Sequence, residues 1–354
     1  MGYLDQQLIT YLGNKRKLLG LIESALDQID GNSFLDLFSG SGVVSRLAKN
    51  KGKYSKIIAN DLEGYSYTIN RCYLSNITDF NEKEYIEIKK NILSLPLKKG
   101  FISELYAPEN SDNILKDERC FYTTENAMKI DTWRQAIEDF CQEEMKPFFI
   151  APLLSECSIH ANTSGVFKGF YKNKLGIGQW GGQGKNALER ICGDIHLNTP
   201  ILSEKKSDFE VFNLDAKELS KKIEVDIAYL DPPYNQHPYG SNYFMLNLIN
   251  DYLPPEKISK VSGIPANWNR SVYNKKSQAL NELEEVVRNL QARYILISYN
   301  NEGFISFEEM LSMLEEFGEV SVSSENYPTF RGSRNLKERE LKVIEYLFCL
   351  KKSH

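Results

Sequence analysis

Apolar stretches alternate with amphipathic ones along the first part of the chain. Residues 18–26 carry apolar side chains at helical spacing, and residues 33–38 form a short apolar run typical of a buried strand. A helix over about 43–49, a strand over 54–59 and a helix near 65–74 are expected next. Because strand, glycine turn, helix and strand form a βαβ unit, this pattern favours a parallel sheet.

The second half of the chain contains further strand-like runs. Residues 209–214, 225–230 and 294–298 are rich in β-branched or aromatic side chains, and a helix is expected near 243–252. Residues 341–350 are apolar on nearly both faces, which suits a central strand, and residues 319–323 are its expected hairpin partner. The pattern therefore predicts an α/β protein.

The middle of the chain, residues 96–204, has a different character. Helical stretches over 127–140 and 146–158 precede a glycine-rich, lysine-bearing run over 165–184 that has no clean periodicity. This region lies between two α/β halves, so we interpret it as an insertion. The expected organisation is one domain formed by 1–95 and 205–354, interrupted by 96–204.

Composition excludes several classes of protein. The chain has 354 residues with a net charge of −5, so any attraction to nucleic acid must come from local basic patches. The six cysteines and four histidines show no metal-ligand spacing, which predicts buried free thiols, no metal site and no Ser-His-Asp mechanism. No signal-like or membrane-spanning run occurs, and nothing suggests an oligomer, so we expect a cytoplasmic monomer.

The most informative motif is Asp231-Pro232-Pro233-Tyr234, directly after the apolar run 225–230. Two consecutive prolines end the strand and fix these four residues in a rigid turn, which we call the step. The step presents a carboxylate, a backbone carbonyl and an aromatic face at the carboxyl end of a strand, where open α/β sheets bind ligands. Such a site suits a planar base with an exocyclic amine. The alternative is an ordinary strand-ending turn with an incidental tyrosine.

A glycine turn, Ser39-Gly40-Ser41-Gly42, follows the first predicted strand and its Asp36. Glycines before a helix N-terminus allow close approach of a ligand and favour carboxylate or phosphate groups. A dinucleotide site would have a third glycine where Ser45 stands. An amino-acid-bearing nucleoside needs only two glycines, so the turn favours that class of ligand.

Two further aspartates follow strands. Asp61 ends the second strand, where an acid can accept both hydroxyls of a ribose, although it could instead cap the following helix. Asp215 follows the strand over 209–214 and is a candidate acceptor for an adenine amine. Capping of a helix over 216–222 is an equally good interpretation of Asp215.

Three blocks now stand in a particular order: Tyr-Leu-Gly-Asn-Lys at 11–15, Phe-Ser-Gly-Ser-Gly at 38–42, and Asp-Pro-Pro-Tyr at 231–234. The chain resembles the Dam-like, D12 class (alpha group) of S-adenosylmethionine-dependent DNA adenine-N6 methyltransferases. That class has a short cofactor motif first, a glycine loop second and a target-recognition insertion before Asp-Pro-Pro-Tyr. Residues 153–157 and 161–166 also look like a stretch found in some restriction-modification members.

The resemblance implies a Rossmann-like methyltransferase fold with a mixed, mostly parallel seven-stranded sheet, and a target-recognition role for 96–204. It implies methyl transfer from S-adenosylmethionine to the N6 amine of an adenine flipped out of double-stranded DNA, with S-adenosylhomocysteine as product. Whether a cognate restriction endonuclease acts alongside is left open.

The resemblance also assigns roles to residues of this chain. Lys15 would hold the cofactor carboxylate together with Tyr11, and Asn14 departs from the glycine frequent at its position. The expected cofactor-binding residues are Tyr11, Asn14, Lys15, Asp36, Phe38, Ser39, Gly40, Gly42, Asp61, Asp215 and Asp231, and the expected catalytic residues are Asp231, Pro232, Pro233 and Tyr234.

Basic residues interleaved with aromatic ones in the insertion indicate contacts with DNA phosphates and bases. A solvated loop with a few core aromatics is the competing interpretation. The expected DNA-binding residues are Lys168, Lys172, Lys174, Lys185 and Arg190 in the insertion, and Arg331 and Arg334 at the tip of the C-terminal hairpin.

Other functions remain open at this point. An RNA N-methyltransferase acting on an adenine or guanine amine would share the glycine turn and the strand-end site. An NAD-linked oxidoreductase is disfavoured by the missing third glycine. A non-enzymatic DNA-binding protein would leave the Asp-Pro-Pro-Tyr step unexplained.

Overall fold

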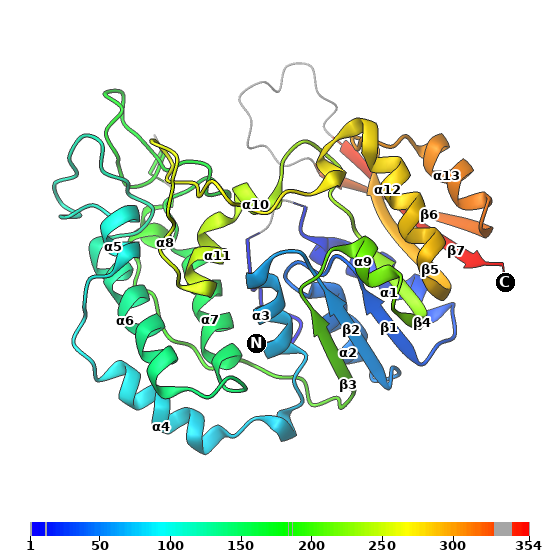
Figure 1. Ribbon diagram of the computed structural model, residues 1–354, viewed down its shortest axis with the longest axis horizontal. Coiled ribbons are helices and arrows are strands. Elements are labelled where there is room, and N and C mark those ends of the chain that lie inside the picture. Colours follow the sequence, from blue (N-terminus) through cyan, green and yellow to red (C-terminus); the bar gives the residue numbers. More distant parts are fainter. Residues whose placement is uncertain (1, 11–12, 183, 186, 329–341, 354) are drawn as a thin grey trace. The chain divides into compact units, whose positions relative to one another are not determined.

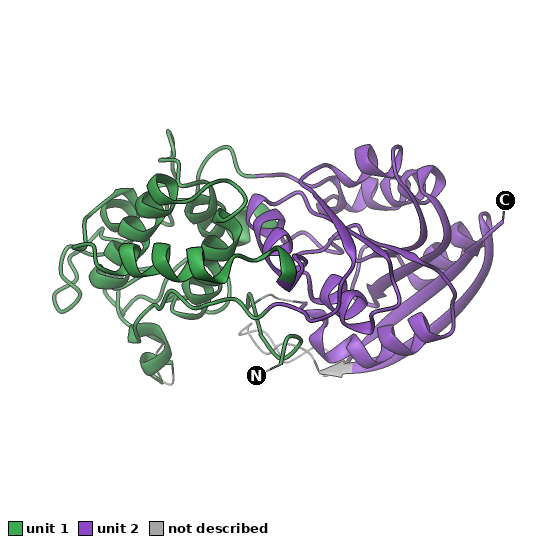
Figure 2. Cartoon of the chain, turned by 90° about the horizontal axis from the view of Figure 1, so that it is seen from below, with its two compact units in different colours: residues 1–12, 78–201, 239–268 green, residues 13–77, 202–238, 269–354 purple. Residues whose placement is uncertain are grey.

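The structure is a computed structural model that describes residues 2–10, 13–182, 184–185, 187–328 and 342–353. The chain divides into two compact units, shown in different colours in Figure 2. Unit 1 comprises residues 1–12, 78–201 and 239–268, and unit 2 comprises residues 13–77, 202–238 and 269–354. Each unit is therefore built from three separate stretches of the chain.

Unit 2 contains a seven-stranded sheet in the order β3-β2-β1-β4-β5-β7-β6 (Figure 1). Neighbouring strands from β3 to β5 pair in parallel, and β7 runs antiparallel to both β5 and β6. The strands are β1 (Ser33–Asp36), β2 (Lys56–Asn60), β3 (Asp208–Phe212), β4 (Glu224–Leu230), β5 (Gln291–Asn300), β6 (Gly318–Pro328) and β7 (Lys342–Lys352). This mixed, mostly parallel sheet confirms the predicted fold class.

Helices flank the sheet because each has one apolar face to bury. One face of the sheet forms a hydrophobic core with α9, α12 and α13, through side chains such as Leu219, Leu283 and Met310. The helices of unit 2 are α1 (Leu19–Asp27), α2 (Val43–Lys51), α3 (Gly64–Tyr73), α9 (Ala216–Ser220), α12 (Lys276–Asn289) and α13 (Phe307–Glu315), with 3₁₀ turns at Lys15–Leu18 and Val272–Asn274.

The hydrophobic pattern located these elements well. The predicted C-terminal strand is β7, which lies between β5 and β6 and forms the expected hairpin with β6. Its interior position explains why both of its faces are largely apolar. Helices α12 and α13 have marked amphipathic patterns that the sequence analysis did not use.

Unit 1 is helical, as predicted for the middle of the chain. Its helices are α4 (Glu82–Leu93), α5 (Phe101–Tyr106), α6 (Thr124–Phe140), α7 (Lys146–Ile159), α8 (Leu188–Cys192), α10 (Tyr239–Asn242) and α11 (Phe244–Asp251). The Arg134 guanidinium on α6 donates to the Ile249 and Asn250 carbonyls at 2.6 and 2.8 Å, which fixes α11 to α6. Thus α10 and α11, which follow the predicted insertion in sequence, pack with it.

The described residues bear on two further predictions. Within them, no helix is long and apolar enough to cross a lipid bilayer. All six cysteines are free thiols, and Cys72, Cys120, Cys141 and Cys157 are buried. The expectation of burial was wrong for Cys192, which is exposed at the end of α8, and Cys349 on β7 is only partly buried.

Candidate active site

The carboxyl ends of β1 and β4 lie side by side, because these two strands are parallel neighbours (Figure 1). Asp36 is the last residue of β1 and is in register with Tyr229 of β4. The Leu37 N–H extends this pairing by donating to the Tyr229 carbonyl over 3.0 Å. Asp231 directly follows β4, so Asp36 and Asp231 both lie at the carboxyl ends of the strands, where open α/β folds bind ligands.

Asp36 is a buried carboxyl group with 1% of its surface exposed. Its Oδ2 accepts hydrogen bonds from the backbone N–H and the hydroxyl of Ser45, at 3.1 and 2.7 Å. Its Oδ1 is buried and has no hydrogen-bond partner among the described residues. Burial is the main cause that raises the pKa of Asp36 to about 7. Ser45, which stands where a dinucleotide fold would have glycine, therefore holds this carboxyl group in place.

The glycine turn between β1 and α2 has the backbone conformation that the sequence indicated. Gly40 and Gly42 have φ values of +49° and +70°, in the region that only glycine adopts readily. A side chain at Gly42 would also place its Cβ 2.4 Å from the Asn70 Oδ1. The Gly40 N–H donates to the Asp61 Oδ2 over 2.8 Å. Contacts with Asp61 and Asn70 thus hold the turn in this conformation.

Asp61 connects the end of β2 to the glycine turn. Besides Gly40, it accepts a hydrogen bond from the Glu63 N–H at 2.9 Å. Burial raises its pKa, against the effect of these backbone hydrogen bonds. The Ser66 hydroxyl and the Leu62 N–H also act on Asp61 as donors that lower its pKa, so its acceptor positions are largely taken within the protein.

Asp215 is exposed and caps helix α9, where its Oδ1 accepts from the Lys217 N–H over 2.9 Å. In this structure Asp215 therefore acts as the N-cap of α9, one of its two predicted roles. Its strand, β3, is at the edge of the sheet, and β2 and β1 separate it from β4. A contact between Asp215 and a cofactor adenine stays a prediction.

The chain directly after the two prolines is held through its backbone carbonyls. The Tyr234 carbonyl accepts the Phe304 N–H at 3.0 Å, and the Asn235 carbonyl accepts the Asn274 Nδ2 at 2.7 Å. The Tyr234 ring lies edge-on to Tyr299, with 6.1 Å between ring centroids. Prolines 232 and 233 have no N–H to donate, so the chain leaves the sheet here as a fixed turn.

Lys15 lies beside this step in a buried ion pair. Its ammonium is 3.1 Å from Asp231 Oδ1, 3.7 Å from Glu345 Oε2 and 5.6 Å from the centroid of the Tyr234 ring. Burial lowers the pKa of Lys15, but the two carboxylates outweigh that effect and raise the pKa well above its usual value. The ammonium therefore remains charged between the two acids.

Asp231 has an unusual acidity in this environment. Burial raises its pKa and Glu345 adds to the rise, while Lys15 lowers it, with a net result of about 6. At neutral pH the group is thus mostly a carboxylate, which accepts hydrogen bonds but is only a weak base.

The sequence analysis missed Glu345. This residue lies on β7 in register with Asn300, the last residue of β5, and 5% of its surface is exposed. It is the single acidic residue in the apolar run 341–350, and that isolation was the available signal. The contact between Glu345 and Lys15 depends on the antiparallel register of β7 against β5, so the sequence alone does not show it.

The other predicted cofactor residues are placed as follows. Phe38 contacts Tyr273 edge-on at a centroid distance of 5.3 Å, and the Ser39 hydroxyl donates to the Asn60 carbonyl at 3.0 Å. Asn14 caps the 3₁₀ turn that carries Lys15 by accepting from the Arg16 N–H at 2.8 Å. Tyr11 lies outside the described residues, as do Arg331 and Arg334.

The predicted DNA-binding residues of unit 1 fall into two groups. Lys168, Lys172, Lys174 and Lys185 have exposed side chains. Lys172 and Lys174 lie on a turn in which the Asn173 Oδ1 accepts from the Leu175 and Ile177 N–H groups at 2.9 and 3.1 Å. The Lys172 ammonium lies over the Phe170 ring, 4.8 Å from its centroid, so this turn combines a basic and an aromatic side chain.

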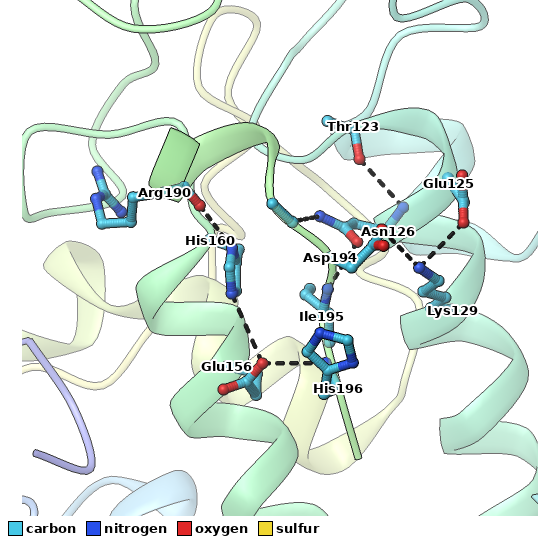
Figure 3. Close-up of polar contacts among 11 residues, drawn as sticks. Thr123, Glu125, Asn126, Lys129, Glu156, His160, Arg190, Asp194, Ile195 and His196 are labelled. Carbon is cyan, nitrogen blue, oxygen red and sulfur yellow. Dashed lines mark hydrogen bonds and ion pairs between the residues drawn. The ribbon is translucent and has the colours of Figure 1, made fainter. Parts of the chain in front are cut away.

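Arg190 has a different environment, shown in Figure 3. Its guanidinium donates to the Ile159 and Ala161 carbonyls at the end of α7, and its own carbonyl accepts from the His160 Nδ1 at 2.5 Å. The following segment is fixed in the same way, because the Asn126 side chain bonds to Gly193 and Ile195 (Figure 3). Arg190 therefore has a structural contact, and its role toward DNA stays a prediction.

Comparison with known proteins agrees with this geometry. The sequence profile of the D12 class N6 adenine-specific DNA methyltransferases matches residues 11–313. The chain is 33% identical to the type II methyltransferase M.NlaIII of Neisseria lactamica, over 98% of this chain and 100% of that protein. It is 32% identical to M.CviAII of Paramecium bursaria Chlorella virus 1, over 96% of this chain and 97% of that protein.

M.FokI of Planomicrobium okeanokoites is 28% identical over 97% of this chain and 52% of that longer protein. The family match spans the glycine turn, the helical unit and the step after β4. The chain therefore belongs to the D12 class of N6 adenine-specific DNA methyltransferases.

Proposed function

We propose that this DNA methyltransferase binds its target base at the step after β4 and S-adenosylmethionine at the glycine turn after β1. The observation that carries the proposal is the placement of Asp231 and Asp36 at the carboxyl ends of neighbouring parallel strands. The two halves of a group-transfer reaction must meet within bond-forming distance. Adjacent strand ends provide that proximity.

The residues at the glycine turn fit such a cofactor. The buried Asp36 Oδ1 lacks a partner among the described residues and suits a donor such as an α-ammonium group. Asp61 lies against the glycine turn and would accept ribose hydroxyls in exchange for contacts it now makes within the protein, and Lys15 would bind a carboxylate. The remaining residues that would line the cofactor are Tyr11, Asn14, Phe38, Ser39, Gly40, Gly42 and Asp215. S-adenosylmethionine supplies an electrophilic methyl group and leaves as S-adenosylhomocysteine.

Asp231 and Pro232 act on the adenine amine. That amine is a poor nucleophile because its lone pair is delocalised into the ring. The Asp231 carboxylate and the Pro232 carbonyl would each accept one N6 hydrogen, which favours a tetrahedral nitrogen whose lone pair can attack the methyl group. As the new N–C bond forms and the bond between sulfur and the methyl carbon breaks, the nitrogen becomes cationic and would lose one proton to the Asp231 carboxylate, from which it passes to solvent. Fixed acceptors and orientation supply most of the acceleration, because a group with a pKa of about 6 is a weak base.

The target base must leave the helix to reach this site, since its amine is paired and stacked in duplex DNA. Tyr234 would stack on the flipped base, and Pro233 keeps its ring in place. Residues 96–204 would read the target sequence, with the exposed lysines of unit 1 and the arginines at 331 and 334 on phosphates or base edges. We infer a site-specific enzyme that acts as a monomer.

The relatives named as type II methyltransferases support a role in restriction-modification. In such a role the chain would protect DNA from a cognate endonuclease that acts separately. Methylation-sensitive sequencing of DNA from cells that express the chain would identify the methylated base, its position and the target sequence together.

The decisive experiment measures transfer of labelled methyl groups to duplex DNA and to ribosomal RNA in parallel. The proposal expects N6-methyladenine in DNA at one sequence and background transfer to RNA. Preferential labelling of RNA, or tight NAD binding without S-adenosylmethionine binding, would contradict it.

A further inference from the structure

Glu345 is a buried acid whose position the catalytic proposal does not explain. Its Oε1 accepts from the Asn300 Nδ2 at 3.3 Å, within the sheet. Its Oε2 is buried and has no hydrogen-bond donor among the described residues. Its nearest cation is Lys15, at 3.7 Å, beyond hydrogen-bond distance. A buried carboxylate with so little hydrogen bonding is costly, so a structural role alone is a poor explanation.

The charges around Lys15 do not cancel. Lys15 contributes one positive charge, and Asp231 and Glu345 contribute two negative ones when both are ionised. A pair of Lys15 and Asp231 alone would be neutral. Glu345 is therefore the group that leaves the step after β4 with an excess negative charge. Asp36 belongs to the same electrostatic environment, because burial and, to a lesser extent, Asp231 and Asp61 raise its pKa.

An excess negative charge has a specific consequence for a methyltransferase. S-adenosylmethionine carries a sulfonium cation, whereas the product S-adenosylhomocysteine has a neutral sulfur. The two ligands are otherwise nearly the same in shape and hydrogen bonding. A negative site therefore stabilises the substrate form of the cofactor more than the product form.

We propose that Glu345 is a positioning residue that fixes Lys15 beside Asp231 and makes the site prefer the cationic cofactor over its neutral product. The inference rests on the proposed use of S-adenosylmethionine. Without Glu345, Lys15 would neutralise Asp231, and product would compete more strongly with fresh cofactor. The residue thus acts through charge and through Lys15, without touching the reacting atoms.

The test compares equilibrium affinities for S-adenosylmethionine and S-adenosylhomocysteine by calorimetry. Glu345→Gln keeps the shape and the hydrogen bond to Asn300 but removes the charge. We expect the ratio of the two affinities to fall by about 5- to 20-fold, as a charge about 10 Å away would produce at an effective dielectric of about 20. Glu345→Asp keeps the charge and should retain the ratio of the wild-type protein.

A merely structural role predicts something else: Glu345→Gln would weaken both ligands equally and leave the ratio unchanged, which would overturn the proposal. Glu345→Asp is the matched control for charge, and a ratio as low in Glu345→Asp as in Glu345→Gln would also overturn the proposal. If the wild-type protein binds neither ligand, the proposed cofactor itself is wrong.

Discussion

The ammonium of Lys15, on the 3₁₀ turn before α1, lies 3.1 Å from the carboxylate of Asp231, after β4. The proposed N-terminal cofactor motif and the Asp-Pro-Pro-Tyr motif are therefore joined by a buried ion pair in this chain. The pair explains why Lys15 is charged despite its burial. If Lys15 binds the cofactor carboxylate as proposed, that contact competes with its ion pair to Asp231.

The acidity of Asp231 predicts how activity depends on pH. Its pKa is raised by burial to about 6, so protonation below that pH removes the acceptor for the adenine amine. We expect kcat/KM for methyl transfer to fall as pH decreases through 6, to about one tenth at pH 5. The measurement is the initial rate at low substrate concentration, from about pH 5 to about pH 8. A rate that stays constant over this range would contradict the assigned role.

We expect the buried carboxyl group of Asp36 to lower the stability of the folded protein at high pH, although it would contribute to cofactor binding. Its pKa is raised from 3.8 to about 7, mainly by burial, so the folded protein binds its proton more tightly than the unfolded chain. The stability contributed by this group is complete below the unfolded pKa and is lost as pH rises through the folded one. Asp36→Asn cannot ionise and should raise the free energy of unfolding at pH 8 by about 1–3 kcal/mol.

Urea denaturation of the ligand-free protein at two pH values checks this effect. The gain from Asp36→Asn should be smaller at pH 5, where the wild-type carboxyl group is largely protonated in the folded state. The same variant should bind S-adenosylmethionine more weakly. A gain that does not depend on pH would show that desolvation of the charge is not its cause.

Substitutions of Tyr234 test the stacking role. Loss of a stacked aromatic ring costs about 1–3 kcal/mol per base, so Tyr234→Ala should lower kcat/KM by about 5- to 150-fold. Tyr234→Phe keeps the ring and should stay near the wild-type rate, whereas Tyr234→Asp adds a repulsive charge and should be the slowest. Equal rates for all of these variants would argue against stacking on the target base.

The salt dependence of DNA binding tests the lysines on the turn of unit 1. Lys172→Gln and Lys174→Gln should each reduce the slope of log affinity against log salt by about one, since each lysine would neutralise about one phosphate. Titration with duplex DNA at several salt concentrations gives this slope. Lys222→Gln, an exposed lysine of unit 2, is the matched control and should leave it unchanged. Identical slopes for all three variants would refute the phosphate contacts.

Much of the fold was predictable from local patterns. The apolar run before Asp231 and the two prolines after it determine both the strand and its end. The glycine turn was equally clear, because positive φ at Gly40 and Gly42 requires glycine. The interior position of β7 followed from an apolar pattern on both of its faces.

Contacts between distant residues were not predictable in this way. The pairing of Glu345 with Lys15 depends on the register of β7 against β5, which no local pattern encodes. The sequence predicted Arg190 as a DNA contact and gave no sign that its guanidinium binds backbone carbonyls at the end of α7. The sequence could not decide whether Asp215 binds an adenine or caps a helix, because a ligand contact depends on tertiary structure. The contact that the structure shows is the local capping hydrogen bond from the Lys217 N–H.

The central claim is that Asp231 accepts a hydrogen of the target amine, and substitution of Asp231 tests it most directly. Single-turnover methyl transfer to duplex DNA is measured alongside equilibrium binding of S-adenosylmethionine, for the wild-type protein and Asp231→Ala. The account predicts N6-methyladenine from the wild-type protein, and a rate lower by at least about 10²- to 10³-fold in the variant with cofactor affinity largely retained. Methyl transfer by Asp231→Ala at the wild-type rate would contradict it.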